Sequence, residues 1–361
     1  MSSISSLSLG NASRASIQRI QSALKDATTE AGSLRHADVG RTLGQVTGNA
    51  VSYRAQDTSI SRMLESNKLV TARLELTDDT MESIYKSAES FSGSLITGVA
   101  TSSGTSTLVA NAATNLQQLV GSLNLNVEGQ YYMAGTMSDV MPAKDGSADV
   151  KAKFAAFLTA SGASGVDTVD PAKLSAYFSD TGWTDGSTVP PTLYRFDDLF
   201  DVQTDASGVE SGAWKDNWSN ANSDAAQSRI SKSETIASSV SANEAAFRKV
   251  ASAYAMISSL GLETMNEGVR SAVATEATKR LKAGMDEITA LRSDVGMRLG
   301  RVEAANASLT QQKDVVSAAF QRLEGVDETE AALRLNSLKT QLETAYAVTG
   351  KLQGLSLLNY L

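Results

Sequence analysis

The stretch that decides the fold is residues 281–323, LKAGMDEITALRSDVGMRLGRVEAANASLTQQKDVVSAAFQRL, in which an apolar residue recurs at every seventh position. The recurring residues are Leu281, Ile288, Val295, Val302, Leu309, Val316 and Leu323. A heptad repeat held over this length predicts a long helix that packs its apolar stripe along a partner in a left-handed coiled coil. We call these seven positions the rod seam.

The N-terminal part of the chain carries helical periodicity of its own. Apolar residues between Ile60 and Leu95 recur at steps of three and four, which predicts a helix over residues 57–99. Residues 101–104, Thr-Ser-Ser-Gly, indicate a turn, and a second periodic stretch then runs to residue 127. We therefore expect an antiparallel helical hairpin here. The same periodicity predicts a further helix over residues 230–261.

Both ends of the chain show the spacing of short amphipathic helices. The apolar positions that we assign to an assembly interface are Ile17, Ile20, Leu24, Leu34, Leu338, Leu342, Leu352, Leu355 and Leu358. A helix with one apolar stripe cannot bury it alone, so we expect these ends to pack against copies of the chain. We also expect them to be poorly ordered in the isolated molecule and helical after assembly. Between the end helices and the rest, Gly40, Gly44 and Gly48 indicate a joint.

The middle of the chain differs in composition from both flanks. All four prolines lie between Pro142 and Pro191, and all three tryptophans lie between Trp183 and Trp218. Because proline costs about 3 kcal/mol inside a helix, this distribution predicts two helical flanks around an insert. Residues 142–224 contain 13 acidic and 6 basic side chains, a balance of −7, whereas the whole chain carries −8. Nearly all of the net charge therefore belongs to the insert.

These patterns predict a mainly α protein, in which long helices from both chain ends form a coiled-coil bundle and the centre is an α/β or β-rich insert domain. We divide the chain into an assembly helix and joint (1–56), a helical hairpin (57–141), an acidic solvent-facing insert (142–224), C-terminal rod helices (225–325) and a second assembly helix (326–361).

Few residues are suited to chemistry. With no cysteine and one histidine, the chain cannot form a disulfide or a cysteine-ligated metal site, and His36 lacks the partners of a catalytic triad. Asp197, Asp198 and Asp201 lack the spacing of a calcium loop. An acidic chain without a basic cluster is unsuited to nucleic acid, and neither a secretion signal nor a membrane span is expected. We predict no catalytic, cofactor or metal site; the alternative is a secreted enzyme with its site in the insert.

Three stretches resemble the flagellin family, which includes the flagellar hook-associated proteins. They are GQYYMAGT (129–136), VGMRLGRVE (295–303) and LQGLSLLNYL (352–361). The third is similar to the end of hook-filament junction proteins, whereas filament flagellins more often end differently; a filament flagellin is the alternative. The resemblance implies a structural part of the bacterial flagellum that is secreted through type III export and works outside the cell. It also implies partners: copies of itself, hook protein or a neighbouring hook-associated protein, filament flagellin and an export chaperone.

Overall fold

The computed structural model describes residues 6–358 of the 361-residue chain, and side chains between residues 10 and 351. By their contacts the residues form two compact units. The central unit is Glu65–Asn306, and the terminal unit combines Met1–Leu64 with Ala307–Leu361. Two long helices, α3 (Thr47–Gly98) and α8 (Glu267–Glu324), contribute to both units.

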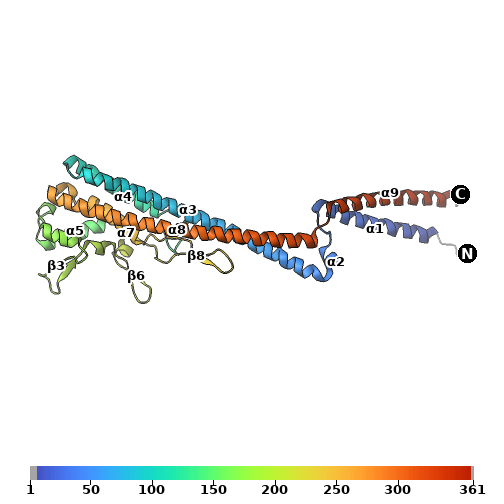
Figure 1. The fold of residues 1–361 in the computed structure, drawn as a ribbon, viewed down its shortest axis with the longest axis horizontal. Coiled ribbons are helices and arrows are strands. Elements are labelled where there is room, and N and C mark those ends of the chain that lie inside the picture. The colour runs from blue at the N-terminus through green and yellow to red at the C-terminus, as the bar shows by residue number, and fades with distance from the viewer. Residues whose placement is uncertain (1–5, 359–361) are drawn as a thin grey trace. The chain divides into compact units, whose positions relative to one another are not determined.

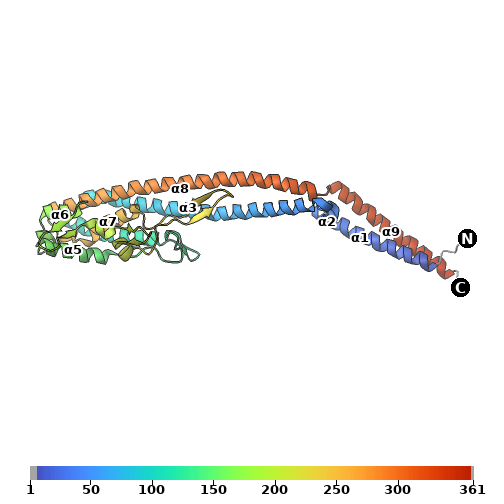
Figure 2. The same ribbon diagram turned by 90° about the horizontal axis from the view of Figure 1, so that it is seen from below.

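Long helices form the central unit, as the heptad and hairpin patterns predict. Figures 1 and 2 both show α3 and α8 side by side within it. The hairpin partner of α3 is α4 (Ser102–Leu123), which Thr101 caps by accepting a hydrogen bond from the backbone N–H of Gly104 at 3.1 Å. A fourth helix, α7 (Ala245–Ser259), packs against α4. The helical hairpin is confirmed, but α3 begins at Thr47 rather than near residue 57.

The rod seam is buried along most of its length. In the central unit, Leu281, Ile288, Val295 and Val302 are at most 1% exposed. They share one core with apolar residues of α3, namely Leu74, Met81, Ile84, Ala88, Phe91 and Leu95. In the terminal unit Leu309 is 3% exposed, whereas Val316 and Leu323 are half-buried. The stripe therefore becomes less covered toward the end of α8.

The insert is a small domain of short helices and hairpins, as its composition predicts. It contains α5 (Ser147–Ser161), η2 (Val166–Thr168), α6 (Pro171–Phe178), η3 (Phe196–Phe200) and η4 (Trp214–Trp218). The antiparallel hairpins of the described chain are β1–β2 (Asn126–Val127, Gln130–Tyr131), β3–β4 (Trp183–Asp185, Thr192–Tyr194), β5–β6 (Gln203–Thr204, Glu210–Ser211) and β7–β8 (Gln227–Arg229, Thr235–Ala237).

Aromatic side chains fill the core of the insert. The rings of Phe157 and Tyr177 stack with centroids 4.2 Å apart, and those of Trp214 and Trp218 stack at 5.5 Å. Phe200 lies against Trp218 at 5.2 Å and so joins the two stacks through η3. Burial raises the pKa of the Tyr177 hydroxyl, as expected for a phenol far from water. The insert therefore has a hydrophobic core of its own that continues into the core of the rod.

The predicted helix over residues 230–261 is wrong in its first half. Residues 227–237 form the β7–β8 hairpin, and the helix α7 begins only at Ala245. Serine side chains account for the difference, because their hydroxyls bond across the hairpin and so compete with helical bonding. The hydroxyl of Ser228 donates to that of Ser238 at 2.7 Å, and the backbone N–H of Ala226 donates to the hydroxyl of Ser239 at 2.8 Å. Ile236 and Val240 are buried, but without a helix.

The joint predicted at the three glycines lies between α1 (Ser6–Ser33) and α3. It contains α2 (Val39–Leu43) and η1 (Gly44–Val46). Gly44 has a φ of +53°, a left-handed conformation that glycine adopts at little cost. Gly48, in contrast, lies in the first turn of α3. The remaining elements are η5 (Leu262–Thr264), before α8, and α9 (Glu328–Leu358), after it.

We predict that Val302→Asp destabilises the protein by at least about 3 kcal/mol, because it places an unpaired charge in a seam position that is 1% exposed. Met297 lies on the same helix but is 63% exposed, so Met297→Asp is the matched control and should change the free energy of unfolding by less than about 0.5 kcal/mol. Urea unfolding followed by circular dichroism at 222 nm measures both. Equal stability of the two variants would show that the seam register is wrong.

Candidate assembly surfaces

Ion pairs fix how α8 lies on α3 in the central unit. The Arg292 guanidinium donates from Nε to Asp78 Oδ1 at 2.8 Å and from Nη2 to Glu82 Oε2 at 3.1 Å. The hydrogen bond to Asp78 raises the pKa of Arg292, and Lys86 and Arg292 lower the pKa of Glu82. Carboxylate oxygens of Asp78, Asp79 and Glu82 lie within 4.8 Å of one another. Because Arg292 already occupies two of these carboxylates, the group acts as a register contact between helices.

A buried amide provides a second register contact. Asn67 on α3 is fully buried, and its Nδ2 donates to Asn306 Oδ1 on α8 at 2.7 Å and to the backbone oxygen of Ile230 at 2.9 Å. A polar group buried in a coiled-coil interface specifies alignment, because slipping by a turn leaves it without partners. The packing of α8 on α3 therefore combines an apolar seam, which provides stability, with polar contacts, which fix the alignment of the two helices.

The terminal helices α1 and α9 lie side by side in the terminal unit (Figures 1 and 2). The predicted positions Ile17, Ile20, Leu24, Leu338 and Leu342 are all half-buried in this pair. The Ser13 and Thr349 hydroxyls are hydrogen-bonded at 2.6 Å, and Gln21 Nε2 donates to the Tyr346 hydroxyl at 2.7 Å. Leu34 is 44% exposed. The side chains of Leu352, Leu355 and Leu358 lie outside the described residues.

The pair is packed unevenly along its length. At its inner end Ala27 and Ala331 are each 1% exposed, whereas toward the chain ends Tyr346 and Val348 are 50% and 49% exposed. One face also has an open groove of about 740 Å³. It is lined by Ala12, Ser13, Ser16, Ile20, Ser337, Thr340, Gln341, Thr344, Ala345 and Val348. Two helices alone therefore leave apolar surface uncovered, as expected of helices that pack against further helices.

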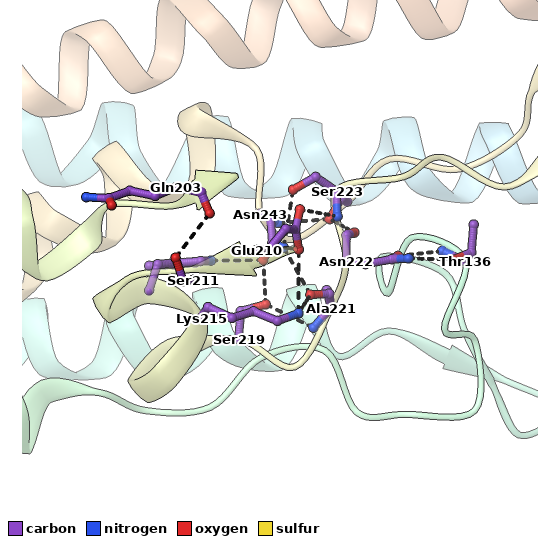
Figure 3. Close-up of polar contacts among 12 residues, drawn as sticks. Thr136, Gln203, Glu210, Ser211, Lys215, Ser219, Ala221, Asn222, Ser223 and Asn243 are labelled. Atoms are coloured by element: carbon purple, nitrogen blue, oxygen red, sulfur yellow. Dashed lines mark hydrogen bonds and ion pairs between the residues drawn. The ribbon is translucent and has the colours of Figure 1, made fainter. Parts of the chain in front are cut away.

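Asn243 is the centre of a buried polar network that holds the insert against the start of α7 (Figure 3). Its Oδ1 accepts from Trp214 Nε1 at 3.1 Å and from the Ser219 hydroxyl at 2.6 Å. Its Nδ2 donates to the backbone oxygen of Ala221 at 3.0 Å and to Glu210 Oε2 at 3.3 Å. Asn243 is 4% exposed, and this many partners satisfy both ends of its amide.

The three aspartates considered for metal binding each face an arginine. Asp197 is paired with Arg280, and Arg195 Nε donates to Asp198 Oδ1 at 2.8 Å. Arg248 Nη1 lies 3.9 Å from Asp201 Oδ1. All three carboxylates are therefore engaged in ion pairs: that of Asp198 is local, whereas those of Asp197 and Asp201 join η3 and its end to α8 and α7. The one histidine, His36, lies with Nδ1 3.7 Å from Glu30 Oε1 in the terminal unit.

The arrangement is that of a structural protein with helical ends: long packed helices, an insert whose core joins theirs, and a pair of end helices with partly uncovered apolar faces. Residues 4–138 match the family described as the bacterial flagellin N-terminal helical region, and residues 278–361 match the bacterial flagellin C-terminal helical region. The chain belongs to the flagellin family. Proteins of this family are structural and non-enzymatic, and they self-assemble in the bacterial flagellum outside the cell.

The fold is also similar to a solved structure described as a flagellar hook-associated protein from Vibrio parahaemolyticus. The two are 11% identical with a TM-score of 0.51, and the match covers 77% of this chain and 97% of the other. No curated protein matches the sequence. No helix among residues 6–358 is long and apolar enough to cross a membrane. The family overturns the alternative of a secreted enzyme with its site in the insert.

The apolar periodicity of the sequence did not reveal the polar residues that form buried contacts in the fold. Arg292, Asn243, Glu30 and Glu324 were not predicted, because a charged or amide residue near an apolar stripe looks the same in sequence whether it is solvated or paired. The sequence does point to burial of Asn67, because this residue falls on the three-and-four spacing of the apolar residues between Ile60 and Leu74. For the others, the partners are far apart in sequence and only the fold brings them together.

We predict that Asn243→Ala destabilises the insert by about 2–4 kcal/mol, because it leaves the buried donors of Trp214 and Ser219 without an acceptor. All three tryptophans lie in the insert, so tryptophan fluorescence during urea unfolding reports on that domain. Asn220→Ala is the control, since Asn220 Nδ2 donates a single exposed bond to the Met141 backbone oxygen at 3.1 Å. If both variants unfold at the same urea concentration, the network does not hold the insert.

Proposed function

We propose that the chain is a hook-associated junction protein that links the flagellar hook to the filament by self-assembly of its terminal helices. The observation that carries this proposal is the sequence of residues 356–361, Ser-Leu-Leu-Asn-Tyr-Leu, which is similar to a stretch typical of junction proteins. The likeness of fold to a flagellar hook-associated protein supports it further, since 97% of that chain is covered.

The terminal unit supplies the means of assembly in this proposal. In the α1–α9 pair, the stripe that contains Ile17, Ile20, Leu338 and Leu342 is only half-buried, and an open groove of mixed apolar and hydroxyl lining runs along one face. Burying one such leucine or isoleucine fully contributes about 1.5–3 kcal/mol. If the α1–α9 pairs of several copies pack together, this burial therefore stabilises the assembly without any change in the central unit.

The insert faces solvent in the same proposal. Its balance of −7 makes it the most charged part of the chain, and its aromatic residues stack on one another in its interior. The remaining expected partners follow from the position between hook and filament: hook protein or a neighbouring hook-associated protein on one side and filament flagellin on the other. An export chaperone would bind the chain before secretion through the type III apparatus.

A filament flagellin is the second candidate, favoured by the matches of residues 4–138 and 278–361 to the flagellin helical regions. The two candidates differ in how far the chain polymerises. Incubating the purified chain with hook fragments, and separately with filament fragments, distinguishes them by electron microscopy. A junction protein adds a short layer of fixed length to hooks and then allows flagellin to elongate. Growth of long filaments from the chain alone would contradict the junction proposal and support the flagellin.

We predict that Leu342→Asp raises the concentration needed for assembly at least about 30-fold, because it replaces a half-buried apolar contact of α9 with a charge. Lys339→Asp is the matched control, since Lys339 lies on the same helix and is exposed. Sedimentation of the hook-bound fraction measures both variants, and circular dichroism checks that both fold. Unimpaired assembly of Leu342→Asp would show that this stripe is not the assembly interface.

A further inference from the structure

The two links that lead into the terminal helices are paired with each other in the terminal unit. The backbone N–H of His36 donates to the Glu324 oxygen at 3.0 Å, and that of Val326 donates to the Leu34 oxygen at 3.0 Å. Arg35 and Gly325 face one another in this antiparallel bridge. Residues 34–36, which follow α1, are thus joined to residues 324–326, which precede α9. We call these two paired segments the double link.

A buried carboxylate secures the α8 side of the double link. Glu324, the last residue of α8, is 1% exposed and is paired with Arg54 of α3. The guanidinium of Arg54 also lies over the ring of Phe320 at 5.1 Å, and that of Arg35 lies over the same ring at 4.7 Å. Glutamate is rarely buried to this extent without a partner, so the pair with Arg54 is what allows Glu324 to stay inside.

A second buried carboxylate secures the α1 side. Glu30 is 7% exposed, and its Oε1 accepts from the backbone N–H of Ala37 at 3.2 Å. Its Oε2 lies 3.4 Å from Arg334 Nη1, a residue of the first turns of α9. His36 Nδ1 lies 3.7 Å from Glu30 Oε1. This single carboxylate therefore contacts α9 and the segment after α1 at once.

The backbone of the double link adopts unfavourable conformations, which neighbouring contacts must stabilise. Leu34 has a φ of +53°, a left-handed conformation that is costly for a residue with a β-carbon. A β-carbon at Gly325 would lie 2.5 Å from the Gln321 oxygen, so the close approach there requires glycine. Backbone of this kind persists only where surrounding contacts hold it.

We propose that the double link is an electrostatic latch, in which Glu324–Arg54 and Glu30–Arg334 hold the α1–α9 pair in one orientation to the ends of α3 and α8 within the terminal unit. In each pair the carboxylate is buried, whereas the side chains of Arg54 and Arg334 are 48% and 61% exposed. A buried carboxylate held by one arginine adds little net stability but selects one arrangement over others, which is the property that a latch requires. Glu30 and Glu324 are thus positioning residues. Their consequence for assembly rests on the proposed function, whereas the latch itself does not.

Charge reversal tests the latch in the full-length chain. Arg54→Glu and Glu324→Arg each leave two like charges together, and the double variant restores an opposite pair. Hydrogen exchange of the His36 and Val326 amides, the two that cross the double link, is the readout. We expect at least about 100-fold faster exchange in each single variant and a return to within about 10-fold of the parent in the double variant.

Arg62→Glu is the matched control, because Arg62 is an exposed arginine on the same helix as Arg54, and it should leave both amides unchanged. Amides of Ile288 and Val295 in the central unit show whether each variant is folded. The latch is contradicted if the single variants behave like Arg62→Glu, or if the double variant exchanges as fast as the single ones. Neither result depends on whether the chain forms a junction or a filament, so failure of the latch and failure of the proposed function are distinguishable.

Discussion

Burial of the rod seam in the core that α8 shares with α3 is the interaction on which the rest of the structure depends. In the central unit its four positions are at most 1% exposed, and they share a core with apolar residues of α3. Each fully buried side chain of this kind contributes about 1.5–3 kcal/mol, so the seam is comparable with the whole stability of an ordinary domain. The helix α7 and the insert then pack onto a rod that is already held together.

The terminal unit differs from the central one in how completely it covers its apolar residues. Val316 and Leu323 of the seam are half-buried, and so is the stripe of α1 and α9. Among the described side chains of the helix pair, full burial is confined to the inner end, around Ala27, Glu30 and Ala331. A unit that is well packed at the joint and open toward the chain ends suits a member of the flagellin family, whose proteins self-assemble.

Long elements could be predicted from the sequence because their periodicity repeats many times. The heptad from Leu281 to Leu323 places α8, and the split of proline and tryptophan separates the insert. The prediction of a helix over residues 230–244 was wrong, since a few apolar residues at helical spacing could not outweigh the hairpin that serine hydroxyls help to join. The assignment of Ile17 to Leu358 as an assembly interface stays a prediction, because a single chain cannot show contacts between copies.

The joint was foreseen only in part. Three glycines indicated a break, yet the residues that shape it are Glu30, Leu34 and Glu324, whose roles come from partners on other segments. The same is true of Asn243, which satisfies donors and acceptors from several turns of the insert. Apolar periodicity depends on neighbours along the helix and can be predicted, whereas a buried polar group depends on the finished fold.

The most direct test of the central claim compares amide hydrogen exchange in the isolated chain and in its self-assembled state. We expect the rod-seam amides of residues 281–302 to be equally protected in both states. We expect the amides of residues 10–24 and 338–350 to exchange quickly in the isolated chain and slowly after assembly. Equal protection of the terminal helices in both states, or protection of the rod that appears only on assembly, would contradict it.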